Sequence, residues 1–357
     1  MAVARRVAIV QEFVPQYRVE FFAGLAQELR RRDIELEVFA GRPGRAMALR
    51  RDAASAAFVH AVPNRRIGKL LWQPCLRSVL RADLVVVEHA NRHLLNWVLV
   101  ARRLLRRSPR LGYWGHGANL QARRPGAAEA VKSWSVRLPD WWFAYTAGSA
   151  ERVVRRGFPA ARTTVVQNSQ RTTPRPRGVL RQRYTAVYVG GLYRDKRVAF
   201  LLEIAAEAHR RCADFRLVVV GDGPDRPAVE AFAGDFVEYK GALFGAEKAA
   251  QLAAASVMLM PGLVGLSVVD AFAAGTPVVT EASPFHSPEF EYLEDGLNAI
   301  VLPNRASAAD YAGALLDALR DPPRMSRLRS GCAGSAAVYT LDAMIENYAD
   351  GVESALA

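Results

Sequence analysis

The sequence predicts an α/β protein built from two doubly wound domains, each with a parallel sheet. Its 357 residues, 51% of them hydrophobic, are enough for two cores of ordinary size. Short apolar runs alternate with helical patterns through short connections, most regularly after residue 184, and this alternation is typical of a parallel sheet. Residues 171–183 contain two prolines, one glycine and no apolar pattern, which indicates a linker. The predicted segments are a first domain at 1–170, the linker at 171–183, a second domain at 184–335 and a closing segment at 336–357.

The charge is divided unevenly along the chain. Up to residue 175 there are 31 Lys and Arg against 12 Asp and Glu, a net charge of +19, whereas the remainder carries a net charge of −6. Nucleic acid and anionic membrane are the partners that such a basic surface usually meets. The sequence shows no platform of alternating aromatic and basic residues for single-stranded nucleic acid, so we expect a membrane surface and no nucleic acid.

The cysteines and the apolar runs indicate in which cellular compartment the protein is expected. Three isolated cysteines form no C-x-x-C pair, which predicts a reduced protein without a zinc site. No run of 18 apolar residues is present, and the opening MAVARRVAIV resembles a first strand more than a signal peptide. We therefore expect a cytoplasmic protein without a transmembrane helix.

The first half is predicted to alternate strand and helix. The expected strands are at 6–10, 34–40, 84–87, 111–117, 143–146 and 164–167, and the expected helices at 21–31, 93–107 and 149–156. Between the first strand and its helix lies QEFVPQYRVE instead of a glycine-rich turn.

Residues 64–81, NRRIGKLLWQPCLRSVLR, combine apolar residues at helical spacing with Trp72 and five basic residues. Such a pattern predicts an amphipathic helix lying on an anionic bilayer, although a packed helix whose arginines reach into water is the alternative. Four arginines, Arg102, Arg103, Arg106 and Arg107, end the helix predicted at 93–107. They either extend this basic surface or complement the dipole at a helix C-terminus.

The second half is predicted to contain one more sheet. The expected strands are at 186–189, 216–220, 236–239, 257–260 and from 278, and the expected helices at 244–254, from 267, at 307–318 and at 341–356. The GDGP that follows the second of these strands lacks the third glycine of a dinucleotide fingerprint.

One stretch, 255–280, predicts an anion site. An apolar run ends in Pro261 and Gly262, a glycine loop follows, and Ser267 and Asp270 have the spacing of an N-terminal helix cap. Gly275 suits the end of that helix. A helix N-terminus reached through a glycine loop presents backbone N–H groups and a positive dipole end to an anion.

Three segments carry a family resemblance. GLVGLSVVDAFAAGTPVV resembles the donor-binding loop and helix of the retaining glycosyltransferases of family 4, which have the GT-B fold of two Rossmann-like domains facing a cleft. YVGGLYRDKRVAFLLEIA resembles the phosphate-binding turn of that family, and FAYTAGSAERVVRRGFPAARTTVVQN resembles its last unit of the first domain. The resemblance extends over most of the chain, and it implies that the last helix packs back on the first domain.

The resemblance implies a set of donor-binding residues. Lys196 matches the lysine that binds the diphosphate, where a cation offsets the charge that develops on the leaving group. Asp270 matches the carboxylate that holds the ribose, although it could serve only as a helix cap. The implied donor site consists of Gly190, Gly191, Arg194, Lys196, Tyr239, Leu243, Gly262, Leu263, Val264, Gly265, Leu266, Ser267 and Asp270.

The chain departs from the family pattern at three positions. Gly191 stands where the family has a phosphate-binding arginine, Gly262 stands where it has a glutamate that contacts the sugar, and Arg171 stands where it usually has an acidic residue. The sugar cannot therefore be inferred from relatives, and a non-catalytic nucleotide- or sugar-binding protein of the same fold stays an alternative.

The resemblance also implies roles for the first domain. His116, in LGYWGHG, matches a histidine that reaches the donor, which makes it a catalytic candidate together with Lys196; a structural loop histidine is the alternative. Tyr17 and Arg18 are candidates for acceptor contact, unless the loop that carries them is merely solvated.

The predicted function is the transfer of a sugar from a UDP- or GDP-sugar to a lipid-linked or polysaccharide acceptor, with retention of configuration. The expectation includes no cofactor, no metal and a peripheral position at the inner face of the cell membrane. A Rossmann oxidoreductase is a weaker alternative, because the glycine fingerprint is incomplete.

Overall fold

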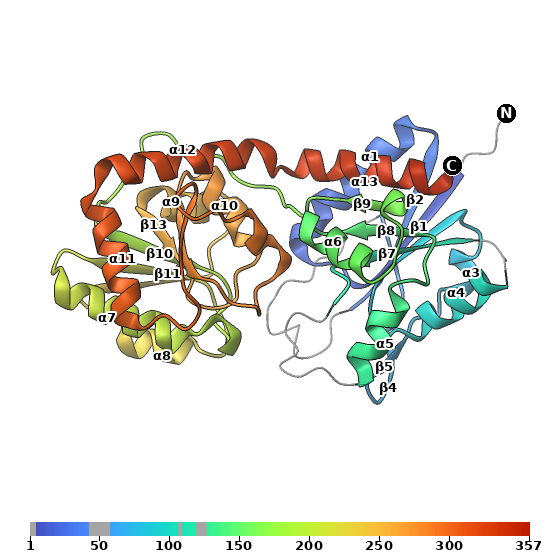
Figure 1. Ribbon diagram of the computed structural model, residues 1–357, viewed down its shortest axis with the longest axis horizontal. Coiled ribbons are helices and arrows are strands. Elements are labelled where there is room, and N and C mark those ends of the chain that lie inside the picture. Colours follow the sequence, from blue (N-terminus) through green and yellow to red (C-terminus); the bar gives the residue numbers. More distant parts are fainter. Residues whose placement is uncertain (1–4, 43–57, 106–108, 119–126) are drawn as a thin grey trace. The chain divides into compact units, whose positions relative to one another are not determined.

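A computed structural model describes residues 5–42, 58–105, 109–118 and 127–357. The chain divides into two compact units (Figure 1). Unit 1 comprises residues 1–171 and 341–357, and unit 2 comprises residues 172–340. Each unit contains its own parallel sheet, so the predicted α/β class is confirmed.

Unit 1 alternates strands and helices from the start of its described part. Its strands are β1 (Arg5–Phe13), β2 (Ile34–Gly41), β3 (Val59–Ala61), β4 (Arg65–Ile67), β5 (Leu70–Trp72), β6 (Leu84–Glu88), β7 (Arg110–Gly115), β8 (Trp141–Ala144) and β9 (Thr163–Val165). Its helices are η1 (Gln16–Arg18), α1 (Val19–Arg31), α3 (Leu76–Val79), α4 (Leu94–Leu104), α5 (Ala127–Ser135), α6 (Ala147–Arg155), η2 (Ala160–Arg162) and α13 (Leu341–Leu356).

Seven of these strands form a sheet in the order β3-β2-β1-β6-β7-β8-β9. Every pairing is parallel, and Val7 of β1 lies opposite Leu36 of β2 and Leu84 of β6. Alternate residues of β1 face opposite layers: Val7 and Ile9 pack on α1 and α13, whereas Ala8 and Val10 join the core formed with α3 and α4. The strand order turns back between β1 and β6, which is the position where open α/β sheets bind ligands.

The helix α13 completes unit 1 from the far end of the chain. Tyr348 stacks on Phe143 of β8 with ring centroids 4.5 Å apart and meets Phe21 of α1 edge to face. A Cβ atom on Gly351 would lie 2.6 Å from the hydroxyl of Thr164, so only glycine permits this approach to the sheet. Arg32 adds ion pairs to Asp350 and Glu353, which raise its pKa.

The prediction of one amphipathic helix at 64–81 is wrong. The structure forms a hairpin of β4 and β5 in which Ile67 lies opposite Leu70, followed by the short helix α3. The turn begins at Gly68, whose φ of +58° suits glycine. Apolar residues three apart match one face of a helix, but they also match a cross-strand pair that flanks a two-residue turn.

Unit 2 contains the second sheet. Its strands are β10 (Thr185–Val189), β11 (Arg216–Val220), β12 (Val237–Gly241), β13 (Val257–Leu259), β14 (Val278–Glu281) and β15 (Ala299–Leu302). Its helices are η3 (Arg194–Lys196), α7 (Val198–Arg211), α8 (Arg226–Phe232), α9 (Gly245–Ala254), α10 (Ser267–Ala273), η4 (Pro288–Tyr292), α11 (Ala308–Arg320) and α12 (Pro322–Val338).

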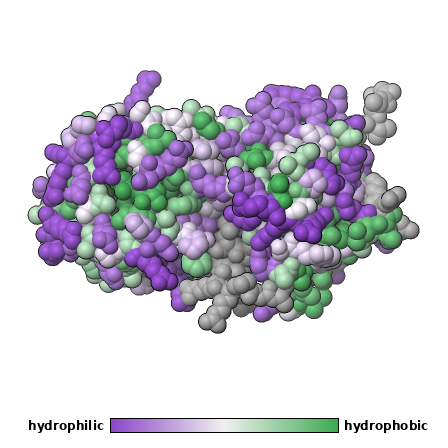
Figure 2. All heavy atoms as spheres, in the orientation of Figure 1, coloured by the Kyte–Doolittle hydropathy of each residue, from purple (hydrophilic) through white to green (hydrophobic). Residues whose placement is uncertain are grey.

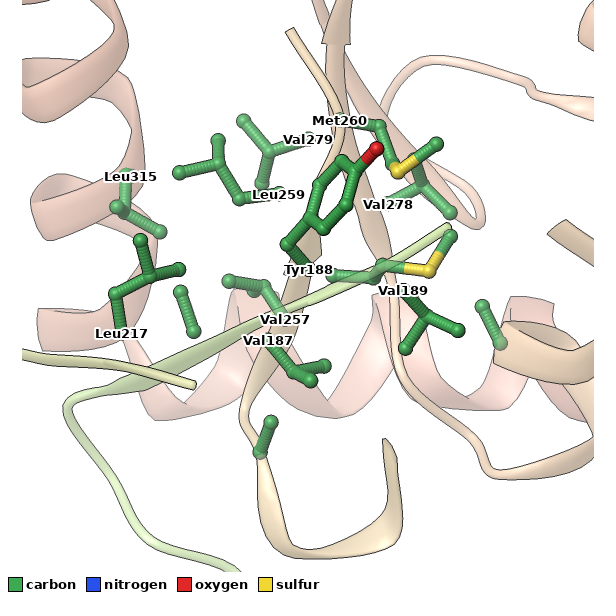
Figure 3. Close-up of a cluster of buried hydrophobic side chains, with 14 of the residues drawn as sticks. Val187, Tyr188, Val189, Leu217, Val257, Leu259, Met260, Val278, Val279 and Leu315 are labelled. Atoms are coloured by element: carbon green, nitrogen blue, oxygen red, sulfur yellow. The ribbon is translucent and has the colours of Figure 1, made fainter. Parts of the chain in front are cut away.

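The second sheet has the order β12-β11-β10-β13-β14-β15, again with parallel pairings throughout. Its direction of growth reverses between β10 and β13. Figure 3 shows the core at this point, where the Tyr188 ring lies among Leu259, Met260 and Val279. The loops that follow β10 and β13 therefore leave the sheet side by side.

The observed elements differ from several predicted bounds. Residues 171–183 contain no helix or strand, but residues from 172 belong to unit 2. The helix α12 runs past residue 335, and the chain passes to unit 1 between Thr340 and Leu341. The helix predicted at 93–107 begins at Leu94, and Arg106 and Arg107 lie outside the described residues. Within the described part of the chain, no helix is long and apolar enough to cross a membrane.

Candidate functional site

The candidate site of unit 2 lies at the carboxyl edge of its sheet. Five consecutive buried residues form β10 and lead directly to Gly190 and Gly191. The hydroxyl of Tyr188 donates to the carbonyl oxygen of Gly191 (2.8 Å), so this buried polar group is satisfied and fixes the turn. A Cβ atom on Gly221 would lie 1.8 Å from the Gly190 oxygen, which explains the first glycine of GDGP as a close backbone contact.

Lys196 lies at the end of η3 and points to the loop after β13. It is 7% exposed, and its Nζ donates to the Leu263 carbonyl oxygen (2.6 Å). The N–H of Leu263 donates in turn to the Asp195 carbonyl oxygen (2.8 Å). The loops that follow the neighbouring strands β10 and β13 are thus joined by two hydrogen bonds, one donated by each loop. Arg194 is exposed, beside this contact in sequence.

The loop after β13 approaches η3 so closely that Gly262 cannot be replaced in this backbone. A Cβ atom there would lie 2.3 Å from the Lys196 carbonyl carbon. Arg197 adds a hydrogen bond to the Pro261 carbonyl oxygen (3.0 Å). A glutamate at position 262 would therefore not fit this backbone, because its Cβ would overlap the backbone of η3.

The predicted cap of α10 is wrong. The helix does begin at Ser267, but the residue at the cap position is Leu266, and no side chain caps the helix. The N–H groups of Val268 and Val269 donate to the carbonyl oxygens of Gly265 and Leu266. Carbonyl groups of the loop, and not a side chain, therefore accept hydrogen bonds from these two amides of the first turn.

Asp270 instead faces a cation of the preceding helix. It is 6% exposed and pairs with the Nζ of Lys248 in α9 (2.7 Å). A carboxylate that is buried needs such a partner to stay charged. The ion pair holds the side chain of Asp270 one turn inside α10, in the helix that follows the glycine loop.

Tyr239 lies in β12, the outermost strand of the same sheet, and Leu243 follows that strand. The hydroxyl of Tyr239 donates to the Gly221 carbonyl oxygen (3.1 Å), and Leu243 packs partly buried on the core. The N–H of Gly190 donates to the Val220 carbonyl oxygen and that of Gly221 to the Gly241 carbonyl oxygen, so the ends of β10, β11 and β12 are connected. The structure thus places the predicted residues of unit 2 along the carboxyl edge of its sheet.

Three residues of this edge were missed by the sequence analysis. His286 accepts a hydrogen bond at Nδ1 from the Val264 N–H (3.1 Å) and donates from Nε2 to the Glu281 carbonyl oxygen (2.8 Å). Burial lowers its pKa, so the imidazole is neutral, with its proton on Nε2. Arg197 pairs with the buried carboxylate of Glu281 (2.7 Å). The one available signal was the position of Glu281 at the end of a strand.

A cavity of about 650 Å³ lies elsewhere in unit 2. It is lined by the turn at Glu294–Leu297 and by α12 residues such as Arg327, Ser335 and Val338. None of the predicted site residues lines it. Among the described residues, no three His, Cys, Asp or Glu side chains gather in a way that could hold a metal ion.

His116 lies in unit 1, in the turn after β7. Burial and the nearby cations Lys132, Arg152 and Arg156 lower its pKa to about 3. Its Nδ1 is buried and has no hydrogen-bond partner among the described residues. At neutral pH the ring is therefore uncharged and a weak base, suited to hydrogen bonding rather than to proton storage.

Tyr17 and Arg18 have different surroundings. Tyr17 is 40% exposed, whereas Arg18 is 5% exposed and donates to the side chain of Asn168 and to the Ser169 carbonyl oxygen. The guanidinium of Arg18 also lies 5.1 Å from the centroid of the Trp114 ring. Arg18 therefore holds unit 1 together, and only Tyr17 of the pair presents much surface.

The carboxyl edge of the unit 1 sheet carries a charged cluster that the sequence analysis did not single out. Glu12, at the end of β1, pairs with Arg66, Arg92 and His93. The hydrogen bond from His93 and the positive charges lower its pKa to about 2. Burial has the opposite effect on nearby Glu88, whose pKa is raised. This cluster lies where the strand order turns back.

Comparisons with known proteins agree with this architecture. The family model described as Glycosyltransferase Family 4 matches residues 20–169, and the model described as Glycosyl transferases group 1 matches residues 183–321. Alpha-D-kanosaminyltransferase of Streptomyces kanamyceticus is 28% identical over 83% of this chain and 76% of its own length.

Solved structures show the same fold. HepE of Anabaena in complex with UDP is 18% identical with a TM-score of 0.69, covering 98% of this chain and all of that one. The apo lipopolysaccharide outer core galactosyltransferase WaaB is 16% identical with the same TM-score, over 98% and 99% of the two chains. The two family models together span both sheets, and the chain belongs to the glycosyltransferases of the family 4 and group 1 type, with the GT-B fold.

Proposed function

We propose that the chain transfers a sugar, with retention of configuration, from a UDP- or GDP-sugar to a lipid-linked or polysaccharide acceptor. Unit 2 binds the donor, and unit 1 binds the acceptor. Solved HepE structures hold UDP, UDP-glucose or UDP with glucose, which supports a nucleoside diphosphate sugar as the donor class. The acceptor class is supported by the similarity to a lipopolysaccharide galactosyltransferase.

The observation that carries the proposal is the joining of two loops at the switch point of the second sheet. Lys196 and the loop Gly262–Ser267 meet there, with Asp270 held a turn further on by Lys248. A diphosphate placed at these loops meets the ammonium group of Lys196, and the carboxylate of Asp270 suits the ribose hydroxyls.

The proposed transfer takes place on one face of the donor sugar. The bond between the anomeric carbon and the phosphate oxygen breaks, and the acceptor oxygen bonds to the same face. The leaving phosphate takes the proton of the acceptor hydroxyl, so no protein nucleophile and no metal is needed. Lys196 stabilises the charge that develops on this phosphate. His116, uncharged at neutral pH, serves as a hydrogen-bonding group rather than as a general base.

The proposed location is the cytoplasmic face of the membrane. The net charge of +19 up to residue 175 supports attraction to anionic lipid. Tyr17, with 40% of its surface exposed, is the proposed acceptor contact in the first loop. Arg18 positions this loop through its bonds to Asn168 and Ser169.

Calorimetric titration with UDP, GDP and NAD tests the donor site. We expect one nucleoside diphosphate to bind, and Lys196→Ala and Asp270→Ala each to weaken binding by about 1–3 kcal/mol, as for hydrogen bonds to charged groups. Arg210→Ala is the control, because Arg210 pairs with Glu207 on α7 and contacts none of the site residues. Binding of neither diphosphate would contradict the proposal.

A second candidate function follows from the glycines. With Gly191 and Gly262 in place of the arginine and the glutamate, the chain could bind a nucleotide sugar without transferring it. Release of the nucleoside diphosphate from a sugar donor in the presence of acceptor distinguishes the two functions. Tight binding without any release would favour the non-catalytic protein.

A further inference from the structure

The hairpin of β4 and β5 has an exposed apolar tip. Ile67 and Leu70 face each other across the turn and are 66% and 41% exposed. Every residue from Arg65 to Leu70 is exposed, and nothing lies within 4 Å of a Cβ placed on Gly68. Exposing two protruding aliphatic side chains to water is unfavourable in free energy, and this penalty is removed when the tip enters an apolar phase.

The base of the hairpin is firmly anchored in unit 1. Leu71 is 1% exposed, and its N–H donates to the Arg92 carbonyl oxygen (2.8 Å). The amide of Gln73 donates to the Gln11 carbonyl oxygen (2.9 Å), and Arg66 pairs with Glu12. The tip is therefore held out on a fixed base, and it lies next to the carboxyl edge of the unit 1 sheet.

The charge of this region is one-sided. Residues 59–82 contain Arg65, Arg66, Lys69, Arg77 and Arg81 and no Asp or Glu. Arg65 lies two residues before Ile67, and Lys69 directly precedes Leu70. Cations around a small apolar tip suit an anionic bilayer, in which the headgroups meet the charges and the aliphatic groups reach the acyl chains.

Other exposed apolar side chains lie on neighbouring elements. Trp134 of α5 is 56% exposed and stacks on Trp97 of α4, and α4 contacts β5. Leu104 and Leu105, at the end of α4, are 61% and 66% exposed. Figure 2 shows hydrophobic atoms on the surface of unit 1 in the region where Figure 1 places these elements.

We propose that the β4–β5 hairpin is the membrane-contacting element of unit 1, with Ile67 and Leu70 inserting between anionic lipids and Arg65 and Lys69 binding their headgroups. The inference deepens the proposed function in one respect, since it names the surface at which a lipid-linked acceptor is met. Because Arg66 links the hairpin to Glu12, insertion places the carboxyl edge of the unit 1 sheet close to the headgroups. The occupant is a bilayer, because the tip combines an apolar pair with cations and no carboxylate, which complements an anionic lipid surface.

Cosedimentation with vesicles tests the inference. The full chain is mixed at an ionic strength of about 0.15 M with phosphatidylcholine vesicles that contain or lack phosphatidylglycerol. We expect binding to the anionic vesicles only. Ile67→Ser with Leu70→Ser lowers the partition coefficient by about tenfold or more, and Arg65→Glu with Lys69→Glu lowers it at least as much, with a weaker salt dependence.

A matched control changes the same residue types in unit 2. Arg177 and Leu180 are both exposed, and Leu180 is 86% exposed, so Arg177→Glu with Leu180→Ser is expected to bind vesicles as the unaltered chain does. Circular dichroism and titration with UDP and GDP are run on every variant. An unchanged nucleotide titration together with lost vesicle binding supports the inference.

Three outcomes would overturn it. In the first outcome, the hairpin variants sediment with the vesicles as well as the unaltered chain does. In the second outcome, the unaltered chain binds neutral and anionic vesicles equally, or binds neither. In the third outcome, the hairpin residues prove necessary for capture of another protein and not for vesicle binding. If the unaltered chain binds a nucleoside diphosphate but no vesicles, the membrane inference fails and the donor site stands; with the reverse result, the donor site fails.

Discussion

Single residues of the proposed donor site act through their hydrogen-bond partners. His286 connects the loop after β13, at Val264, with the end of β14, at Glu281. Its ring also stacks on Phe290 with centroids 4.3 Å apart. Val264 itself is fully buried, so its N–H has no access to water. One neutral imidazole therefore helps to fix the conformation of the loop after β13, together with the hydrogen bonds of Lys196 and Arg197.

Replacing His286 is expected to weaken donor binding. In His286→Ala the buried Val264 N–H loses its acceptor, which costs about 1–3 kcal/mol, and the loop no longer has one favoured conformation. His286→Asn retains an acceptor and is expected to be less harmful. The dissociation constant of the best nucleoside diphosphate, from calorimetry, is the measurement. Equal affinities of the alanine variant and the unaltered chain would contradict a positioning role for His286.

The same residue predicts a pH dependence. Burial lowers the folded-state pKa of His286 below its ordinary value of 6.5. The unfolded chain therefore binds a proton more readily than the folded one, so the stability from neutral His286 is complete above about pH 6.5 and decreases as the pH falls below it.

At the scale of elements, the charged cluster of unit 1 connects three segments. Glu12 lies near the end of β1, Arg66 belongs to β4, and Arg92 with His93 precedes α4. The carboxylate of Glu12 is nearly buried, with 6% of its side chain exposed, so these pairs are screened less than pairs at the surface.

This cluster predicts that stability falls in acid. The pKa of Glu12 drops from 4.5 to about 2 on folding, which corresponds to about 3 kcal/mol at neutral pH. Because the folded-state pKa is the lower one, this stability is present above pH 4.5 and is lost as the pH falls toward 2, with less than about half left at pH 3.

Urea denaturation of the unaltered chain and of Glu12→Gln is the measurement. We expect Glu12→Gln to be less stable at pH 7 by up to about 3 kcal/mol, and the difference to shrink at pH 3. Glu151→Gln, in an exposed pair with Arg155, is the control and should change little. A difference that is constant with pH would show that Glu12 acts through packing alone.

At the scale of the whole molecule, the chain returns to its first unit after completing the second. The helix α13 supplies Leu341, Met344, Tyr348 and Val352 to the core of unit 1, although it begins about 175 residues after the last strand of that sheet. The stability of unit 1 therefore depends on residues that are synthesised after unit 2.

Tyr348 offers a sharp test of this arrangement. Its ring is fully buried among Phe21, Trp114 and Phe143, so Tyr348→Ala is expected to destabilise unit 1 by about 3–5 kcal/mol. Its hydroxyl has no hydrogen-bond partner among the described residues, so Tyr348→Phe is expected to be neutral or slightly stabilising. Thermal unfolding followed by tryptophan fluorescence distinguishes the two variants. Similar losses in both variants would mean that the hydroxyl matters more than the ring.

Much of the fold could be predicted from the sequence, because apolar runs, glycines and charge are local properties. Most strands of the two parallel sheets, the helix α13 at 341–356 and the glycine loop beside Lys196 are visible in this way, whereas the short strand β3 (Val59–Ala61) was not predicted. The hairpin was not predicted, because Ile67 and Leu70 have a spacing that a helix and a two-residue turn share. The cap of α10 was mispredicted, because the partner of Asp270 lies 22 residues away in α9.

The sequence by itself determined the α/β class, the division into two parts, the uneven charge, and Lys196, Gly262 and Asp270 as site candidates. The tertiary structure alone decided which side chains meet. It paired Glu281 with Arg197, placed His286 against Val264 and enclosed Arg18 within unit 1. The physical reason is that periodicity records which face of an element is apolar, whereas a hydrogen bond or ion pair between distant residues depends on how the strands are ordered in the sheet.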